Sequence, residues 1–291
     1  MNNTCVKPKV QFLTSPYGTT CVEFTGVNMG VGCSVSCIYC HFHEYIEKKH
    51  PDSIGVTFDI SSVKNKKKLP QFIYLCPHTE PFSAENKENT YEFMKIVLPK
   101  GVFLWVLTKS IIPDNVIELI SKYPAQVEIA VGVTNTDKAR NGFIEPGAPD
   151  AGERLDNILR VSKTKCRYGA RMDPIFPLID DATETLNKTI QTIAKYGVKN
   201  LVASYLMLPA NIYQKFLDIP QFKSMLQLFT DRSPTTSGVA LSIPIEHKME
   251  KYSEIAKIAK NYGMSLFVCS CRDIRLKDFD AKKLGYSLNC R

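Results

Sequence analysis

The sequence has no run of about 18 consecutive apolar residues, which is the length that a membrane-spanning helix needs. Its first nine residues, M-N-N-T-C-V-K-P-K, contain no apolar core of the kind found in secretory signal peptides. We therefore expect a cytoplasmic protein with no membrane partner. The sequence also contains no low-complexity tract and no internal repeat at a fixed period, which excludes a repeat architecture.

Cysteine, in contrast, is plentiful, with ten cysteines in 291 residues. Because disulfides are rare in the cytosol, this number favours metal binding or reactive thiols over a disulfide framework. The length fits one large α/β domain or two small ones. The formal net charge of +8 is compatible with a polyanionic partner without requiring one.

Three of the cysteines, Cys33, Cys37 and Cys40, lie within eight residues that read C-S-V-S-C-I-Y-C. They follow a strand-like segment at 20–27. Three thiolates on one short loop can hold three irons of a [4Fe–4S] cluster and leave the fourth iron open to another ligand. One alternative is a zinc site, although zinc ligands usually come as two close pairs. Another is a set of three reduced, buried cysteines.

Beyond this loop, apolar strand-like runs alternate with helical patterns. Strands are expected at 72–76, 102–107, 126–133, 166–172, 200–206, 238–243 and 265–268, and the basic segment 61–68 is expected to be an exposed loop. Strands that are apolar throughout indicate a parallel sheet covered on both faces. Six or more such units favour a barrel or partial barrel.

The cysteine spacing, with Tyr39 before the last cysteine, resembles the signature of the radical S-adenosylmethionine (SAM) superfamily. Several segments further resemble its spore photoproduct lyase-like branch. They are 27–40, 75–81 (L-C-P-H-T-E-P), 106–110 (V-L-T-K-S), 145–155 (E-P-G-A-P followed by E-R-L) and 171–181 (R-M-D-P-I-F-P followed by two aspartates). The last segment departs from the branch, because a glycine of its pattern is absent here.

The resemblance implies an α/β fold, a partial (β/α)6 TIM-like barrel of the radical SAM type with a short cysteine-bearing C-terminal extension. We expect an N-terminal extension at 1–19, the core barrel at 20–245 and the tail at 246–291. The resemblance also implies that SAM chelates the open iron. One electron from the cluster would then cleave SAM to a 5′-deoxyadenosyl radical, which abstracts hydrogen from a substrate. A reductant such as flavodoxin or ferredoxin would supply the electron.

The resemblance also places SAM contacts at the ends of four strands. Thr79 and Glu80 would accept hydrogen bonds from the SAM ammonium, and the alternative is a turn closed by proline. Lys109 would pair with the SAM carboxylate as a compact positive charge. The alternative is a lysine that is only solvated at the end of an apolar strand. The remaining candidates are Thr134 and Asn135 for the ribose hydroxyls, and Arg171 and Asp173 as a pair near the adenosyl group or as a buried structural salt bridge.

Cys76 lies three residues before Thr79. In spore photoproduct lyase, a cysteine near this position returns a hydrogen atom to the product radical. The spacing differs by one residue here. A buried free cysteine also behaves as an ordinary small hydrophobic residue, so both interpretations stay open.

A second group of cysteines occupies the C-terminal region, at Cys269, Cys271 and Cys290. These residues could ligate a second iron–sulfur cluster, with a fourth ligand from the substrate or from Cys5, Cys21 or His247. Such auxiliary clusters occur in radical SAM enzymes that modify peptides. The alternative is one buried core cysteine and two incidental thiols.

Three functions are compatible with these patterns. The first is a radical SAM enzyme that repairs or modifies a nucleic acid or nucleotide, supported by the lyase-like core, the basic balance and the lysines at 48–49 and 64–68. The second is a radical SAM enzyme that modifies a peptide, protein or small metabolite with help from an auxiliary cluster. The third is a non-catalytic iron–sulfur protein.

Overall fold

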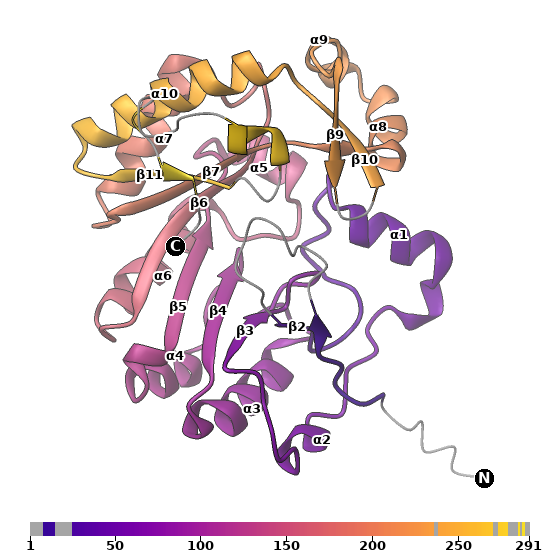
Figure 1. The fold of residues 1–291 in the computed structure, drawn as a ribbon, viewed down its shortest axis with the longest axis vertical. Coiled ribbons are helices and arrows are strands. Elements are labelled where there is room, and N and C mark those ends of the chain that lie inside the picture. The colour runs from indigo at the N-terminus through magenta and orange to yellow at the C-terminus, as the bar shows by residue number, and fades with distance from the viewer. Residues whose placement is uncertain are drawn as a thin grey trace.

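The computed structural model describes residues 8–14, 25–235, 238–269, 273–278, 285 and 287–288. The main feature is a nine-stranded sheet with the strand order β1-β2-β3-β4-β5-β6-β7-β11-β12 (Figure 1). The short strand β1 (Leu13–Thr14) runs antiparallel to β2, and all other neighbours in this sheet are parallel. The parallel strands all begin at one end of the sheet and finish at the other. We call these two ends the amino edge and the carboxyl edge of the sheet.

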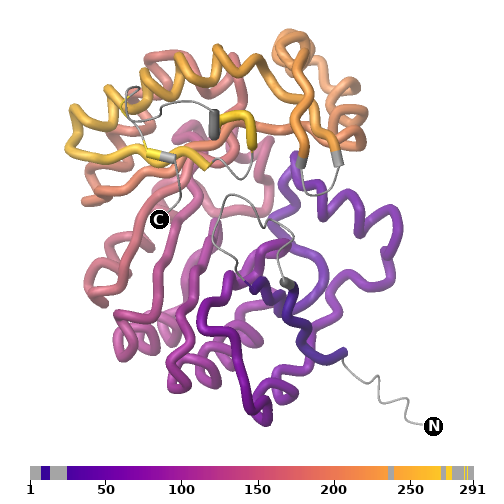
Figure 2. The backbone as a smooth tube through the Cα atoms, in the orientation of Figure 1, coloured from indigo at the N-terminus to yellow at the C-terminus, as the bar shows by residue number. Residues whose placement is uncertain are grey.

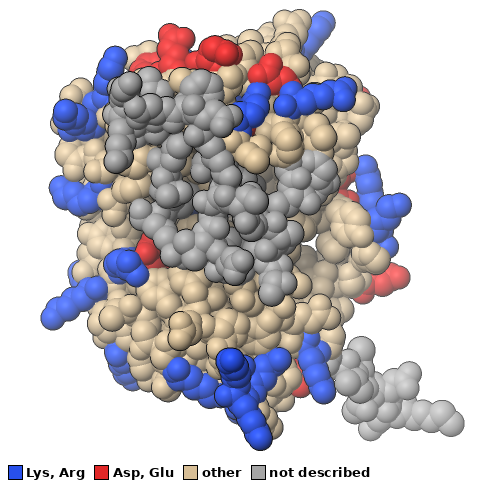
Figure 3. All heavy atoms as spheres, viewed as in Figure 1, with Lys and Arg blue, Asp and Glu red and all other residues tan. Residues whose placement is uncertain are grey.

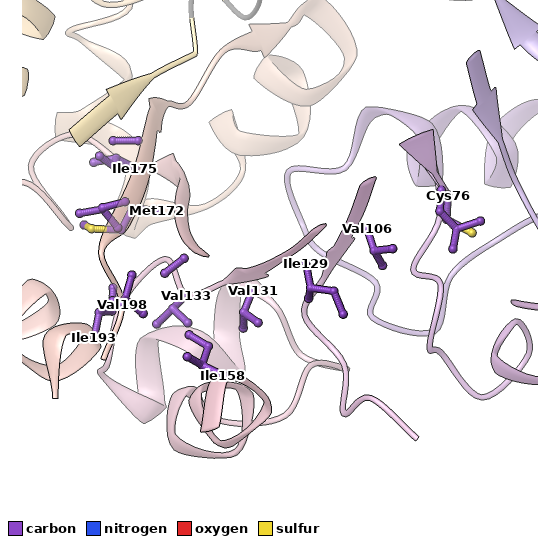
Figure 4. Close-up of a cluster of buried hydrophobic side chains, with 14 of the residues drawn as sticks. Cys76, Val106, Ile129, Val131, Val133, Ile158, Met172, Ile175, Ile193 and Val198 are labelled. Atoms are coloured by element: carbon purple, nitrogen blue, oxygen red, sulfur yellow. The ribbon is translucent and has the colours of Figure 1, made fainter. Parts of the chain in front are cut away.

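The parallel strands follow one another in sequence and in space. They are β2 (Thr25–Val27), β3 (Phe72–Leu75), β4 (Phe103–Thr108), β5 (Val127–Gly132), β6 (Arg167–Ile175), β7 (Asn200–Tyr205), β11 (Ser265–Val268) and β12 (Ser287–Leu288). Their apolar side chains form the core together with those of the helices. Figure 4 shows Val106, Ile129, Val131 and Ile158 in this core.

Helices connect the parallel strands and cover the sheet. The α-helices are α1 (His41–Lys49), α2 (Ser61–Lys64), α3 (Lys87–Val97), α4 (Asp114–Ser121), α5 (Lys138–Ile144), α6 (Ala151–Ser162), α7 (Thr183–Ala194), α8 (Ala210–Leu217), α9 (Lys223–Leu226) and α10 (Ile245–Asn261). The 3-10 helices are η1 (Pro51–Ser53), η2 (Leu98–Lys100), η3 (Pro124–Gln126), η4 (Pro220–Phe222) and η5 (Ile274–Asp278).

Helix α6 illustrates how the local sequence sets an element. Asp150 and Glu153 form a capping box at its start, each side chain accepting a hydrogen bond from the other residue's main chain. One face of the helix then buries Leu155, Ile158 and Val161 completely. The helix therefore begins at a local signal and is held in place by its apolar face.

A second, antiparallel sheet of three strands has the order β8-β10-β9, with β8 (Leu208–Pro209), β9 (Asp231–Thr235) and β10 (Gly238–Ser242). The prediction that 238–243 continues the parallel alternation was therefore wrong. Val239 is 61% exposed while Ala240 is buried. Such one-sided burial is typical of an antiparallel sheet with a solvated face.

The segment 61–68, expected to be a loop, begins with helix α2. The carboxylate of Asp59 accepts hydrogen bonds from the main chain and the hydroxyl of Ser61, at 3.0 and 2.6 Å. Val63 is fully buried and anchors this turn to the core. The rest of the segment is exposed apart from the half-buried Ser62.

The C-terminal elements extend the main sheet. The chain passes through α10 and returns as β11, which pairs with β7 in parallel (Figure 2). Among the helices of the described residues, none combines the length and the apolar character required to cross a membrane.

Candidate active site

The carboxyl ends of the parallel strands bring most of the predicted site residues to one edge of the sheet. The loop with the three cysteines follows β2, and Glu80 lies in the loop after β3. Lys109 follows β4 directly. Residues at this edge are the ones that form active sites in barrels of parallel strands.

The cysteine loop presents three partly buried thiols. Burial raises the pKa of Cys33 to about 11 and that of Cys37 to about 12, and both thiols lie within electrostatic reach of Cys40. Cys40 is also the N-cap residue of helix α1, since its sulfur accepts a hydrogen bond from the main chain of His43 at 3.4 Å. No three His, Cys, Asp or Glu side chains within the described ranges converge on a single metal ion.

This donor set fits a [4Fe–4S] cluster. The ligands of such a cluster are cysteine thiolates on separate irons, and the loop supplies three thiols from eight residues. A coordinating metal deprotonates a thiol outright, which would overcome the raised pKa values. The cluster itself remains a prediction.

The segment 144–147, at the start of the E-P-G-A-P motif, supports the cysteine loop. The main chain of Ile38 donates a hydrogen bond to the carbonyl of Ile144 at 3.0 Å, and Gly147 donates one to Val35 at 3.0 Å. A Cβ atom on Gly147 would lie 2.0 Å from the carbonyl oxygen of Ser34. Only glycine therefore allows the two loops to approach this closely.

Gly147→Ala is expected to displace the cysteine loop, to lower the iron content of anaerobically purified protein and to destabilise the fold by roughly 1–3 kcal/mol, as overpacking does. Gly142→Ala in helix α5 is the matched control, because a Cβ there has no atom within 4 Å. The control is expected to keep full iron content and to be neutral or slightly stabilising. Iron analysis and urea unfolding measure both effects. Equal iron content in the two variants would contradict the role of Gly147.

Glu145 is the centre of a buried network behind the cysteine loop. Glu145 and Arg154 are both fully buried, and a guanidinium nitrogen of Arg154 lies 2.5 Å from Oε2 of Glu145. The hydroxyl of Tyr39 donates a hydrogen bond to Oε1 at 2.6 Å. Burial opposes ionisation of Glu145, but Lys109 and Arg154 outweigh it and lower the pKa of this carboxyl. Glu145 is therefore a carboxylate that ties the loop to helix α6.

Lys109 extends from the end of β4 toward the same network. Its ammonium lies 3.9 Å from Oε1 of Glu145 and 5.9 Å from the ring centre of Tyr39. Burial would lower the pKa of Lys109, but Glu145 and Cys37 outweigh it and raise the pKa. Gly132 makes room for the lysine, since a Cβ there would lie 2.9 Å from its Cγ. The structure thus places the positive charge of Lys109 within electrostatic reach of Cys37, and the predicted contact with the SAM carboxylate remains a prediction.

Glu80 joins the ends of β3 and β4. Its carboxylate accepts hydrogen bonds from the hydroxyl of Thr108 and from the main chain of Lys109, the latter at 2.9 Å. Burial raises the pKa of this carboxyl. Thr79 is more open, and its hydroxyl lies 3.5 Å from the side-chain oxygen of Asn28. These contacts indicate that Glu80 holds the ends of β3 and β4 in position. Contact of Thr79 or Glu80 with SAM stays a prediction.

Thr134 and Asn135 lie at the end of β5, as predicted, but both are buried and have partners inside the protein. The hydroxyl of Thr134 accepts a hydrogen bond from Arg140 at 2.7 Å, and the amide of Asn135 donates one to Asp180 at 2.8 Å. Arg140 and Asp180 form an ion pair with each other. A structural role accounts for these contacts, and binding of the ribose stays a prediction.

Arg171 and Asp173 form the expected pair on β6, with a nitrogen–oxygen distance of 2.8 Å. The guanidinium of Arg171 lies 5.9 Å from the ring centre of Trp105. Asp173 also raises the pKa of Lys109, which places the pair within electrostatic reach of that lysine. The ion pair is confirmed, whereas its position near the adenosyl group is a prediction.

Cys76 follows β3 and has a left-handed backbone, with φ of +54°. Its side chain belongs to the hydrophobic core cluster and is 4% exposed (Figure 4). Burial raises the pKa of its thiol to about 12. This environment suits the interpretation as a small hydrophobic residue, and the hydrogen-donor role stays a prediction.

The second group of cysteines is described only at Cys269, which is buried directly after β11. Cys271 and Cys290, and the potential fourth ligands Cys5 and Cys21, lie outside the described residues. His247 directs Nε2 at the carboxylate of Asp181, at 3.1 Å, and Tyr205 donates a hydrogen bond to the same oxygen. The auxiliary cluster therefore stays a prediction.

Glu145, Arg154 and Gly147 had no predicted role, although all three lie in a motif that carries the family resemblance. The sequence signal that could have identified these three residues was their spacing in the motif E-P-G-A-P followed by E-R-L. His78 was also missed. Its ring stacks on Phe42 of helix α1 with centroids 3.7 Å apart, and burial lowers its pKa to about 4, so this histidine is neutral at physiological pH.

Sequence comparisons find relatives without assigned activities. No family model matches the chain. The uncharacterized protein ORF301 of Acidianus two-tailed virus is 23% identical over 224 residues, which cover 67% of this chain and 74% of the viral protein. The uncharacterized protein Rv2578c of Mycobacterium tuberculosis is 24% identical over 189 residues, 59% of this chain and 55% of that protein. The chain thus spans about half the length of its mycobacterial relative.

Comparison with solved structures defines the class of fold, the partial TIM-like barrel of the radical SAM type. A mutant of spore photoproduct lyase has a TM-score of 0.66 and 13% identity, covering 90% of this chain and 80% of that chain. Spore photoproduct lyase complexed with dinucleoside spore photoproduct has a TM-score of 0.64 and 12% identity, with the same coverage. The fold class predicted from the sequence motifs is therefore confirmed.

Proposed function

We propose that this chain is a radical SAM enzyme. The observation that carries the proposal is the placement of three thiols, Cys33, Cys37 and Cys40, at the carboxyl edge of a parallel sheet, with the ammonium of Lys109 held 3.9 Å from Glu145 and within electrostatic reach of Cys37. When bound there, the cluster supplies the electron that cleaves SAM to methionine and a 5′-deoxyadenosyl radical, which abstracts hydrogen from the substrate.

The residues of the chain would bind and orient SAM. Lys109 pairs with its carboxylate, and Glu145 holds the lysine in position from the far side. Thr79 is the accessible acceptor for its ammonium, since Glu80 is already engaged by the end of β4. Arg171 and Asp173 lie on the strand that would face the adenosyl group.

The substrate that we propose is a nucleic acid or nucleotide. Support comes from the fold, because solved complexes of spore photoproduct lyase with dinucleoside spore photoproduct share it, and one of them also contains AdoMet. Helix α1 follows the cysteine loop directly and carries Lys48 and Lys49 in its last turn, where Lys48 also pairs with Glu44 at 2.6 Å. The lysines at 64–68 precede β3 and therefore lie at the opposite edge. They do not support this substrate.

An alternative is a peptide, protein or small-metabolite substrate. Cys269 favours it, because the residue follows β11 at the same edge of the sheet as the cysteine loop. An auxiliary cluster at this place would face the substrate side.

Anaerobic incubation with SAM and dithionite tests the proposed function. The expected product is 5′-deoxyadenosine, measured by liquid chromatography. An intact cluster without SAM cleavage would refute the enzyme and leave the non-catalytic iron–sulfur protein.

Lys109→Ala is expected to weaken SAM binding by about tenfold or more, because a hydrogen bond to a charged group contributes about 1.5–3 kcal/mol. The visible absorbance of the cluster should be unchanged, since the lysine is not a ligand. Calorimetric titration with SAM measures the affinity. Lys138→Ala is the control, because this lysine is 87% exposed on helix α5. Unaltered SAM affinity in Lys109→Ala would refute the contact.

A further inference from the structure

The segments at the amino edge of the parallel sheet carry charged side chains of positive sign only. Six segments lead into β3, β4, β5, β6, β7 and β11, at 61–71, 98–102, 122–126, 163–166, 195–199 and 260–264. Together they contain eleven lysines and no aspartate or glutamate. The formal charge of the whole chain is +8, so the rest of the protein is net negative. We call these eleven lysines the amino-edge ridge.

The ridge is a continuous line because its strands are consecutive neighbours in the sheet. With strands about 4.8 Å apart, the five intervals from β3 to β11 span about 24 Å. Figure 3 shows the result as Lys and Arg side chains along the lower and left margins, where the amino ends of these strands lie in Figure 1. The candidate active site occupies the opposite edge.

The positive charge of the ridge is not neutralised within the described part of the chain. All eleven lysines are exposed, and none forms an ion pair with an acidic side chain of the described residues. The ammonium of Lys100 contacts only a carbonyl, that of Lys64, at 2.9 Å. Lys66, Lys67 and Lys100 line a surface pocket of about 620 Å³.

The side chains exposed at this edge indicate which kind of partner it can bind. None of the large apolar side chains exposed in the described residues lies in the six segments. A stable protein interface or a membrane contact would need such side chains at its centre. Tyr123, Tyr196 and Tyr262 lie in the segments but pack against the core, so they provide no open stacking platform. What remains is a line of ammonium groups, which matches regularly spaced phosphates.

We propose that the amino-edge ridge binds the phosphate backbone of a nucleic acid without reading its bases. A duplex of about seven base pairs spans its length. Because the ridge and the candidate active site lie at opposite edges, nucleic acid bound here anchors the protein and is not presented to the cysteine loop. The proposal does not rest on the chemistry of the active site.

Fluorescence anisotropy with a labelled random-sequence duplex of about 20 base pairs tests the proposal in a salt series. The full chain, purified anaerobically, is expected to bind at low salt and to release the duplex steeply as salt rises. The first variant changes Lys64, Lys66, Lys67 and Lys68 to glutamine, and the second changes Lys163, Lys195, Lys199 and Lys260. The matched control changes Lys138, Lys188, Lys223 and Lys257, which are exposed elsewhere and remove the same charge.

Each ridge variant is expected to bind about tenfold or more weakly, and to lower the slope of log K against log salt by about 1 for each phosphate that it no longer neutralises. The control should weaken binding by less than about threefold. Circular dichroism and SAM affinity should be unchanged in all variants. Absence of binding at low salt, or an equal weakening in the control, would overturn the proposal. Displacement of the duplex by poly-glutamate as readily as by unlabelled duplex would overturn it too, and would assign the ridge to an acidic protein.

Discussion

The triple variant Cys33→Ala, Cys37→Ala and Cys40→Ala is expected to lose the visible absorbance of the cluster and all cleavage of SAM. Thiolate sulfur is the ligand that holds the irons, and the three thiols lie on one loop at the carboxyl edge of the sheet. Loss of the ligands removes the electron source, so no 5′-deoxyadenosine should form. Iron analysis and the dithionite assay measure both effects.

Cys166→Ala is the matched control for this experiment. Cys166 is also buried, but it lies before β6 at the other edge, where its thiol contacts the carbonyl of Ile120 at 3.6 Å. This variant should keep its iron and its SAM cleavage. A triple variant that still cleaved SAM would contradict the assignment of the cysteine loop. A triple variant that retained about four irons without cleaving SAM would instead reveal the second cluster.

Arg154→Leu is expected to destabilise the fold by about 3–5 kcal/mol, because it leaves the buried carboxylate of Glu145 without its closest cation. Both residues are fully buried, and Arg154 also donates hydrogen bonds to the carbonyls of Gly132 and Pro149. The free energy of unfolding in urea measures the destabilisation. The cysteine loop should also bind less iron, since Tyr39 reaches the same carboxylate.

Arg160→Leu on the same helix is the control for Arg154→Leu. Arg160 pairs with Asp114, whose side chain is 92% exposed. An exposed ion pair contributes about 0–1 kcal/mol, so the control should lose little stability and no iron. Replacing Glu145 and Arg154 together by glutamine and methionine should recover part of the stability, because no buried charge is then unpaired. Equal destabilisation by Arg154→Leu and Arg160→Leu would contradict the role of the buried network.

The fold was largely predictable because its signals are local. Each apolar run that forms β3 to β7 was expected within a few residues of its observed bounds. The run at 238–243 was also a strand, but its sheet could not be predicted. An apolar segment shows that a strand is buried, whereas its neighbours are decided by where the rest of the chain lies.

The same distinction applies to the candidate site, where some residues were predictable from a local pattern and others are brought together only by the tertiary structure. The sequence by itself determined the three thiols of the cysteine loop, because ligands within eight residues need only a local turn to come together. Only the tertiary structure decided that Glu145 joins Tyr39, Lys109 and Arg154, and that Glu80 is engaged by the end of β4. These contacts join residues from separate strands and helices. Their partners depend on burial and on the order of strands in the sheet, which no local pattern specifies.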